Sequence, residues 1–429
     1  MKKIDCRGAD WRSKLEGLSN RPAYPPEAEK AAAGIIADIR ARGVEAICEY
    51  AWKFDHVKLT SGQFRIGAEE IAAAAAKVSP ADKKAIRTAC RQVRDFARAT
   101  RPVSWKKTIR PGVLVGEQFT PLDRVGVYIP GGTAPLVSTV IHTAGIAAAC
   151  GVKEIVAVTP PGGIHPETLC AMKCAGVTEV YRLGGVYGVA AVTVGVPGIP
   201  KVQKLVGPGN AYVTAAKKLL YGEVGIDLVA GPSEILIIAD GSADPELVAA
   251  DLLSQAEHGS GLEQAVLISA DAKLFDAVEK ACLRQKKSLS REALIDRVWE
   301  KGVFFIRVPD LERAAEAANL YAPEHLELQI EKPGKLLPRL KAAGAIFLGP
   351  WTPEPIGDFC AGPSHVLPTA SSALRFSGLE SASFFRRSSI VRYSRQALSR
   401  EVEIVERFGA MEHLDAHGRA GSIRFRSEK

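Results

Sequence analysis

The chain has 429 residues, of which 47% are hydrophobic, 24% charged and 7% aromatic. This length suits about two to four domains, and the composition excludes a disordered, collagen-like or low-complexity protein. Its net charge of +8 is spread along the chain, so we predict no nucleic-acid partner. No apolar run reaches the length of a membrane span, so we predict a cytoplasmic protein without a membrane partner.

Residues 28–100 predict a helical scaffold. In residues 28–55 and 71–99, apolar side chains recur at helical spacing with charged side chains between them. The turn-rich segment at residues 105–124 follows, and beyond it the pattern changes.

From Val125 onward, short apolar runs alternate with amphipathic segments, which is typical of βαβ units. The runs VGVYI, EIVAVT, VTEVYRL, VQKLV and IDLVA predict one parallel sheet between Val125 and Ala230. The runs EILIIAD, QAVLISA, VFFIRV, HLELQI and AIFLG predict a second α/β domain. A Pro/Gly-rich stretch then ends the alternation, and residues 395–417 predict a terminal helix.

Eight cysteines, with no C-x-x-C pair among them, indicate reduced thiols. Cys170 and Cys174 lie four residues apart, a spacing that would place both side chains on one face of a helix. A zinc site would need two further soft ligands nearby, so two small buried residues is the favoured interpretation.

Two glycine-rich turns follow predicted strands, at Ile129–Pro135 and Val206–Val213. Such turns let backbone N–H groups approach a phosphate, although they also serve as plain connections.

Several polar residues are candidates for chemistry. Gln255 and His258 end a predicted helix, Glu324 and His325 adjoin at a helix-to-strand turn, and Asp358 and His365 share a Gly/Pro-rich loop. His413 and His417 form an H-x-x-x-H pair on the terminal helix. Nitrogen and oxygen donors of this kind suit Zn²⁺, with Gln255, His258, Asp358 and either His413 or His417 as ligands.

Eight motifs stand in one order along the chain: RVGVYIPGGTA, VGPGNAYV, AGPSEILIIAD, DLLSQAEHG, YAPEHLELQ, GAIFLG, GDFCAGPSHVLPT and EHLDAH. With them the chain resembles the histidinol dehydrogenase family over most of its length. The resemblance implies an α/β fold with two Rossmann-like parallel-sheet domains, arranged as in aldehyde dehydrogenases, and with helical N-terminal and C-terminal extensions. The implied domains are an extension at 1–25, a zinc-binding and catalytic domain at 26–124 and 237–376, a nucleotide-binding domain at 125–236, and a C-terminal tail at 377–429.

The resemblance also implies the roles of individual residues. Glu324 and His325 match the catalytic pair, and Gln255, His258, Asp358 and His417 match the zinc ligands, which leaves His413 as a neighbour. The substrate contacts are implied at Ser233, Gln255, His258, Glu324, Asp358, His365, Glu412 and His417. The cofactor contacts are implied at Tyr128, Tyr187 and Asn210.

The activity implied is oxidation of an amino alcohol, L-histidinol, to L-histidine with one Zn²⁺ per subunit and two NAD. His325 is expected to take the hydroxyl proton, and Glu324 to activate water for the second oxidation. The family is dimeric, so Glu412 and His417 are expected to complete the partner's site. Cys360, two residues after Asp358, is an alternative nucleophile for the aldehyde step.

The chain departs from the family pattern on the cofactor side. His142 stands where the family has methionine, and Tyr187 replaces a cofactor-binding glutamine. Two alternatives follow: a paralogue that oxidises another polar alcohol, such as a sulfopropanediol, and a binding protein that has lost catalysis. The presence of both Glu324 and His325 argues against the second.

Overall fold

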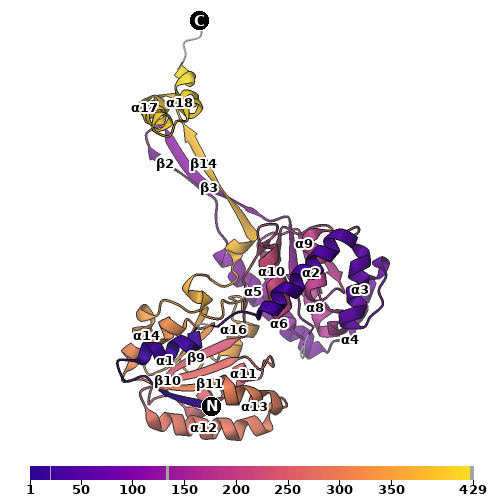
Figure 1. Ribbon diagram of the computed structural model, residues 1–429, viewed down its shortest axis with the longest axis vertical. Coiled ribbons are helices and arrows are strands. Elements are labelled where there is room, and N and C mark those ends of the chain that lie inside the picture. The colour runs from indigo at the N-terminus through magenta and orange to yellow at the C-terminus, as the bar shows by residue number, and fades with distance from the viewer. Residues whose placement is uncertain (20, 132–134, 426–429) are drawn as a thin grey trace. The chain divides into compact units, whose positions relative to one another are not determined.

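The computed structural model describes residues 1–19, 21–131 and 135–425. The chain folds into two compact units, one made of residues 1–100 and 122–383, the other of residues 101–121 and the chain from residue 384 onward (Figure 1). No helix in the described ranges is both long and apolar enough to cross a membrane. The domain boundaries predicted from the sequence stay a prediction.

The first sheet of the larger unit is fully parallel, as expected. Its strand order is β6-β5-β4-β7-β8, and its central strands are buried because they consist of apolar residues. The strands are β4 (Arg124–Tyr128), β5 (Glu154–Val158), β6 (Glu179–Tyr181), β7 (Lys204–Val206) and β8 (Gly225–Ile226). The connecting helices are α6 (Val137–Val140), α7 (Ile146–Ala149), α8 (Pro166–Ala175), α9 (Gly185–Val194) and α10 (Ala211–Leu220).

The predicted helical scaffold is confirmed, and it packs on this sheet's helices. Helix α2 packs against α9 and α10, and α5 packs against α7 and α8. Between α6 and α7 lies a π-helical turn, Ile141–Gly145, all of whose residues are buried. The scaffold helices are α2 (Pro26–Arg42), α3 (Val44–Asp55), α4 (Ala68–Lys77) and α5 (Pro80–Thr100).

The second sheet has six parallel strands in the order β1-β11-β10-β9-β12-β13. The five predicted strands are present, and the sheet gains β1 (Lys2–Asp5), whose polar sequence gave no strand signal. The others are β9 (Glu234–Ala239), β10 (Gln264–Ser269), β11 (Val303–Arg307), β12 (His325–Gln329) and β13 (Ala345–Leu348). The helices are α1 (Trp11–Ser19), α11 (Pro245–Ala256), α12 (Ala272–Gln285), α13 (Glu292–Lys301), α14 (Leu311–Tyr321), α15 (Pro333–Leu336) and α16 (Glu354–Phe359).

The smaller unit contains a three-stranded antiparallel sheet that the sequence analysis did not predict. Its order is β14-β3-β2, with β2 (Trp105–Arg110) and β3 (Val113–Pro121) close in sequence and β14 (Phe385–Tyr393) far from them. Two helices follow, α17 (Arg395–Met411) and α18 (Asp415–Ser422). Gly409 lets them approach closely, because a Cβ there would lie 2.8 Å from the Gly418 nitrogen.

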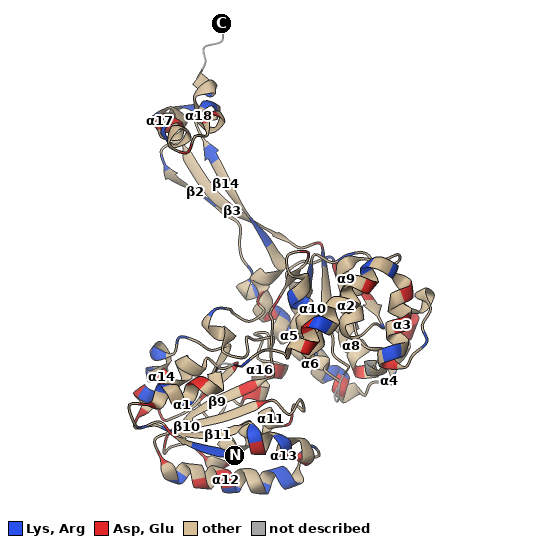
Figure 2. Cartoon of the chain, in the orientation of Figure 1, with Lys and Arg blue, Asp and Glu red and all other residues tan. Residues whose placement is uncertain are grey.

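Charged residues of both signs alternate along the helices of both units (Figure 2). Helix α12, for example, carries lysine and arginine interspersed with aspartate and glutamate.

Candidate active site

Glu324 and His325 lie where α14 gives way to β12. Helix α14 ends at Tyr321, the next residue Ala322 has the left-handed φ of 51°, and His325 begins the strand beside β9. Both side chains are buried, at 5% and 2% exposure. The predicted helix-to-strand turn is confirmed, and it places an acid and an imidazole next to each other at the start of a central strand.

The hydrogen bond at Nδ1 sets the tautomer of His325. Nδ1 lies 3.2 Å from the main-chain oxygen of Glu234. Because a carbonyl oxygen can only accept, Nδ1 must carry the proton. The other nitrogen, Nε2, is buried and has no hydrogen-bond partner among the described residues. Burial lowers the pKa of His325 to about 4, so a neutral imidazole presents Nε2 as a proton acceptor.

The Glu324 carboxyl group is held by a main-chain N–H group and by a side-chain hydroxyl group. Its Oε2 accepts a hydrogen bond from the Glu234 nitrogen at 2.9 Å, and Ser233 hydrogen-bonds to the same side chain. Burial raises the pKa of Glu324 well above its usual value, and nearby Asp358 raises it further. A carboxyl group with a raised pKa is suited to proton transfer as a base or as an acid.

Asp358 lies on the short helix α16, not in a loop as the sequence analysis predicted. The reason is local: Pro353 precedes a helix that begins at Glu354 and ends at Phe359, with Cys360 as its C-cap. Although burial raises the pKa of Asp358, three surrounding histidines, His365, His325 and His258, lower it below its usual value.

Glu354, which lies one helical turn before Asp358, was not predicted from the sequence to belong to this site. One ligand atom each from His325, Glu354 and Asp358 lies within 4.8 Å of the other two. Glu354 Oε1 is 3.4 Å from His325 Nε2, and burial raises the pKa of Glu354 to about 10. The i, i+4 spacing of Glu354 and Asp358 after a proline was the available signal.

Gln255 and His258 come from the C-terminal end of α11. Gln255 is fully buried, and neither atom of its amide has a hydrogen-bond partner among the described residues. His258 lies two residues beyond the helix end and is exposed. A buried amide without a partner, together with the Asp358 carboxylate and imidazoles, is a donor set that suits Zn²⁺, so the residues present fit this metal.

His365 lies between Asp358 and the buried His142. Its Nδ1 is 3.0 Å from the Asp358 main-chain oxygen, and its ring stacks on that of His142 at 4.6 Å with 9° between the planes. Thr139 Oγ1 lies 3.5 Å from the other ring nitrogen. His142 occupies the π-helical turn, which aims its ring at the site.

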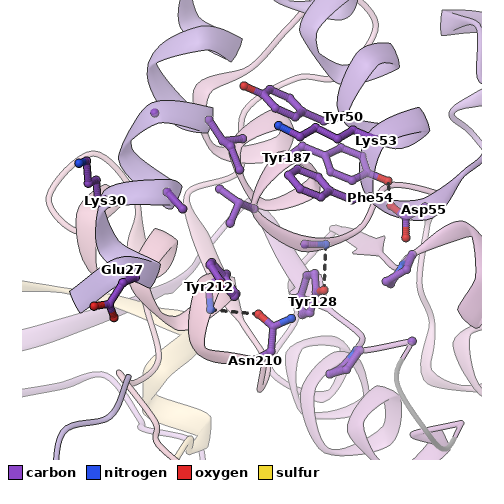
Figure 3. A pocket seen from close by; sticks show the side chains of 18 residues that line it. Glu27, Lys30, Tyr50, Lys53, Phe54, Asp55, Tyr128, Tyr187, Asn210 and Tyr212 are labelled. Atoms are coloured by element: carbon purple, nitrogen blue, oxygen red, sulfur yellow. Dashed lines mark hydrogen bonds between the residues drawn. The ribbon is translucent and has the colours of Figure 1, made fainter. Parts of the chain in front are cut away.

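The predicted cofactor residues line a cavity of about 1020 Å³ between the scaffold helices and the first sheet (Figure 3). The Tyr128 hydroxyl accepts from the Gly185 nitrogen at 3.0 Å, and the Tyr187 hydroxyl donates to Asp55 at 2.6 Å. Asn210 caps α10 by accepting from the nitrogens of Tyr212 and Val213. The aromatic walls are formed by Tyr50, Phe54, Tyr128, Tyr187 and Tyr212.

Of the two glycine-rich turns, Val206–Val213 borders this cavity through Asn210 and Tyr212. Gly207 has φ of 115°, and a Cβ there would lie 2.3 Å from the Tyr128 oxygen, so only glycine fits. In the turn Ile129–Pro135, residues 132–134 lie outside the described residues, and only Pro130 and Gly131 are seen to line the cavity.

Glu412, His413 and His417 belong to the smaller unit, where all three are exposed. The predicted H-x-x-x-H pair on one helix is wrong. Helix α17 ends at Met411, His413 has a left-handed φ of 56°, and His417 lies on α18. The helix breaks because Gly409 brings α18 back against α17.

The chain is similar over nearly its whole length to proteins named histidinol dehydrogenase. The sequence profile of the family described as histidinol dehydrogenase matches residues 20–425. A histidinol dehydrogenase of Geobacter sulfurreducens is 45% identical over 430 residues, which cover 99% of this chain and 100% of that protein. One of Geobacter metallireducens is 44% identical over 432 residues, covering 100% and 99%. The crystal structure of a histidinol dehydrogenase from Elizabethkingia anophelis superimposes with a TM-score of 0.93 at 34% identity, covering 99% of this chain and 98% of that one.

Proposed function

The chain belongs to the histidinol dehydrogenase family, a family of oxidoreductases, and from that premise we propose that it oxidises L-histidinol through L-histidinal to L-histidine. The proposal includes one Zn²⁺ per subunit, two NAD per turnover, and a cytoplasmic place at the last step of histidine biosynthesis. The observation that carries it is the buried Glu324–His325 pair. Among the described residues His325 Nε2 has no hydrogen-bond partner, and it lies 3.4 Å from Glu354 and 3.7 Å from Asp358.

His325 is proposed as the base of the first oxidation. Its Nδ1 proton is committed to the Glu234 oxygen, so the hydroxyl proton of the substrate can go only to Nε2. Because burial keeps the imidazole neutral, this nitrogen is ready to accept a proton at neutral pH.

Glu324 is proposed to take a proton from the water that hydrates the aldehyde. One of its oxygens stays bound to the Glu234 nitrogen, which fixes the carboxyl group while the proton moves. The raised pKa of Glu324 makes it a stronger base than an ordinary glutamate. Cys360 is not required for this step.

Gln255, His258 and Asp358, with His417 of the partner subunit, are proposed to hold the zinc ion. When bound, zinc supplies a template that orients the substrate's amino and imidazole nitrogens. Ser233, His365 and the partner's Glu412 are proposed as further substrate contacts. Ser233 supports this role because it already lies beside Glu324.

NAD is proposed to bind in the cavity lined by Tyr128, Tyr187 and Asn210, and it supplies the hydride acceptor. The cavity's size and aromatic walls suit a nucleotide. Tyr187 is 1% exposed and its hydroxyl is engaged by Asp55, so it shapes the wall where the family has an amide side chain.

The test of the whole proposal is turnover by the purified protein with Zn²⁺, NAD and a panel of L-histidinol and sulfonated diols. We expect two NADH for each histidinol consumed, with histidine as product. One NADH per substrate, or activity on a sulfonated diol alone, would assign the chain to the paralogous alcohol dehydrogenases instead.

A further inference from the structure

Three of the eight cysteines gather where α5 packs against α8. Cys90 on α5 is buried, whereas Cys170 and Cys174 lie one turn apart on α8 and are only partly buried, contrary to the prediction of two buried residues. The Cys90 sulfur is 3.6 Å from the Cys174 main-chain oxygen, and the two thiols hydrogen-bond to each other. This contact brings the two cysteines together across the interface between α5 and α8.

Basic side chains surround the more accessible of these thiols. Arg94, one turn after Cys90, donates to the Cys174 oxygen at 2.8 Å, and Arg87 lies close enough to act on the same thiol. The hydrogen bond from Cys90 and the two arginines lower the pKa of Cys174 to about 6 against the opposing effect of burial. Reactive cysteines in proteins occupy such partly exposed, electropositive surroundings.

Cys90 has the complementary character. The hydrogen bond to Cys174 and burial raise its pKa, so it keeps its proton. Cys48 is an internal comparison, because it is partly buried like Cys174 but burial alone raises its pKa.

We propose that Cys174 and Cys90 form a redox-active pair that hydrogen peroxide converts to a disulfide. In the first step the Cys174 thiolate attacks a peroxide oxygen: an S–O bond forms, the O–O bond breaks, and hydroxide leaves and is protonated to water. In the second step the Cys90 sulfur attacks the sulfenic acid: the S–S bond forms, the S–O bond breaks, and the Cys90 proton leaves with the oxygen as water. The two thiols lose two electrons, and the peroxide is reduced to two molecules of water.

The disulfide would join two helices that support the candidate active site. Both α5 and α8 pack against the π-helical turn Ile141–Gly145, whose His142 stacks on His365. Oxidation therefore fixes the packing behind this histidine pair without touching the Glu324–His325 pair.

The experiment is peroxide treatment of the full-length protein, followed by peptide mapping without reduction. We expect a linked peptide containing Cys90 and Cys174 that disappears with dithiothreitol. In Cys90→Ala, which cannot resolve the intermediate, a sulfenic acid should be trapped at Cys174 by dimedone. Cys174→Ala should form no disulfide at Cys90, and the matched variant Cys48→Ala should behave as wild type.

Alkylation of the untreated protein gives a second readout that does not depend on any variant folding. At pH 7, Cys174 should react at least about tenfold faster than Cys48, because it is largely thiolate. Equal rates at the two cysteines, or a peroxide-treated protein in which Cys90 stays reduced, would overturn the proposal. A bond between Cys170 and Cys174 in place of Cys90 would overturn it as well.

Discussion

At the scale of single residues, one backbone position organises the candidate active site. The Glu234 main chain donates to Glu324 through its nitrogen and accepts from His325 through its oxygen. At the start of β12, the Glu324 side chain is therefore a hydrogen-bond acceptor, and the adjacent His325 side chain is a hydrogen-bond donor. These two hydrogen bonds fix both side chains and leave His325 Nε2 available. Each residue of the pair can therefore carry out one of the two proposed proton transfers.

We predict that substitutions in this pair separate the two oxidations. His325→Ala should lower the rate of alcohol oxidation, since the proton acceptor Nε2 is lost, while Glu324→Gln should chiefly lower oxidation of supplied histidinal. General acid–base assistance is worth about 10² to 10⁴ in rate, so both losses are measurable by NADH formation. Zinc content should be unchanged in Glu324→Gln. Aldehyde oxidation within about threefold of wild type in Glu324→Gln would assign water activation to another base, with His365 the next candidate.

A second residue-scale prediction concerns zinc. His258→Ala should lose most of the metal measured by elemental analysis, because a nitrogen ligand is removed. His417→Ala should do the same, whereas His413→Ala should retain zinc near the wild-type level. A wild-type zinc content in both His258→Ala and His417→Ala would exclude the proposed ligand set. Loss of zinc in His413→Ala would make His413 the zinc ligand in place of His417.

At the scale of elements, a buried ion pair holds the glycine-rich turn that borders the cofactor cavity. Lys217 on α10 pairs with Asp227 and donates to the Gly207 oxygen at 2.8 Å, and Asp227 accepts from the Gly207 nitrogen at 2.6 Å. Both polar groups of one glycine are therefore fixed by one ion pair. Lys218, the next residue, is exposed and pairs with the partly exposed Glu29.

These neighbouring lysines form a matched test. Lys217→Met should lower the free energy of unfolding by about 3–5 kcal/mol, because the Asp227 charge is left buried without its partner. Lys218→Met should change it by no more than about 1 kcal/mol, as is usual for exposed pairs. Urea denaturation measures both. The Michaelis constant for NAD should rise in Lys217→Met and stay unchanged in Lys218→Met; equal effects of the two substitutions would show that the ion pair does not hold the turn.

The strands also show which parts of the fold could be predicted from the sequence. Ten of the eleven strands of the two parallel sheets overlap the predicted runs, because strands buried on both faces, such as β9 and β10, are uninterrupted apolar runs. Strand β1 was not predicted, because KKID at a sheet edge has mostly exposed side chains. Strand β2 is exposed along its whole length, so it lacks the alternation that marks a half-buried strand.

The residues of the candidate site also differ in whether the sequence alone could predict them. Glu324, His325, Asp358 and Gln255 were predictable from motifs, since each carries its chemistry at a recognisable turn or helix end. Glu354 was not, because its part in the site depends on a distance to His325 that only the fold creates. The Cys90–Cys174 contact likewise joins residues 84 positions apart.

At the scale of the whole molecule, the smaller unit presents large apolar side chains to solvent within a single chain. Helix α17 buries only Ala397 and Gly409, while Ile404, Phe408 and Met411 are 54%, 54% and 65% exposed. Contiguous exposed apolar residues of this size mark interaction surfaces. We therefore propose a homodimer in which this unit packs on the partner, which also agrees with the proposed trans role of Glu412 and His417.

The final prediction tests this sharing of sites between subunits. We expect His417→Ala and His325→Ala homodimers to be inactive, the first for lack of a zinc ligand and the second for lack of the base. In a heterodimer of the two variants, purified with two different tags after co-expression, one site receives an intact His325 from one subunit and an intact His417 from the other. The second site carries both defects. Turnover per dimer should therefore return to about half of the wild-type value. If each site were built from a single chain, every site in the heterodimer would carry one defect, and the mixed dimer would stay as inactive as its parents.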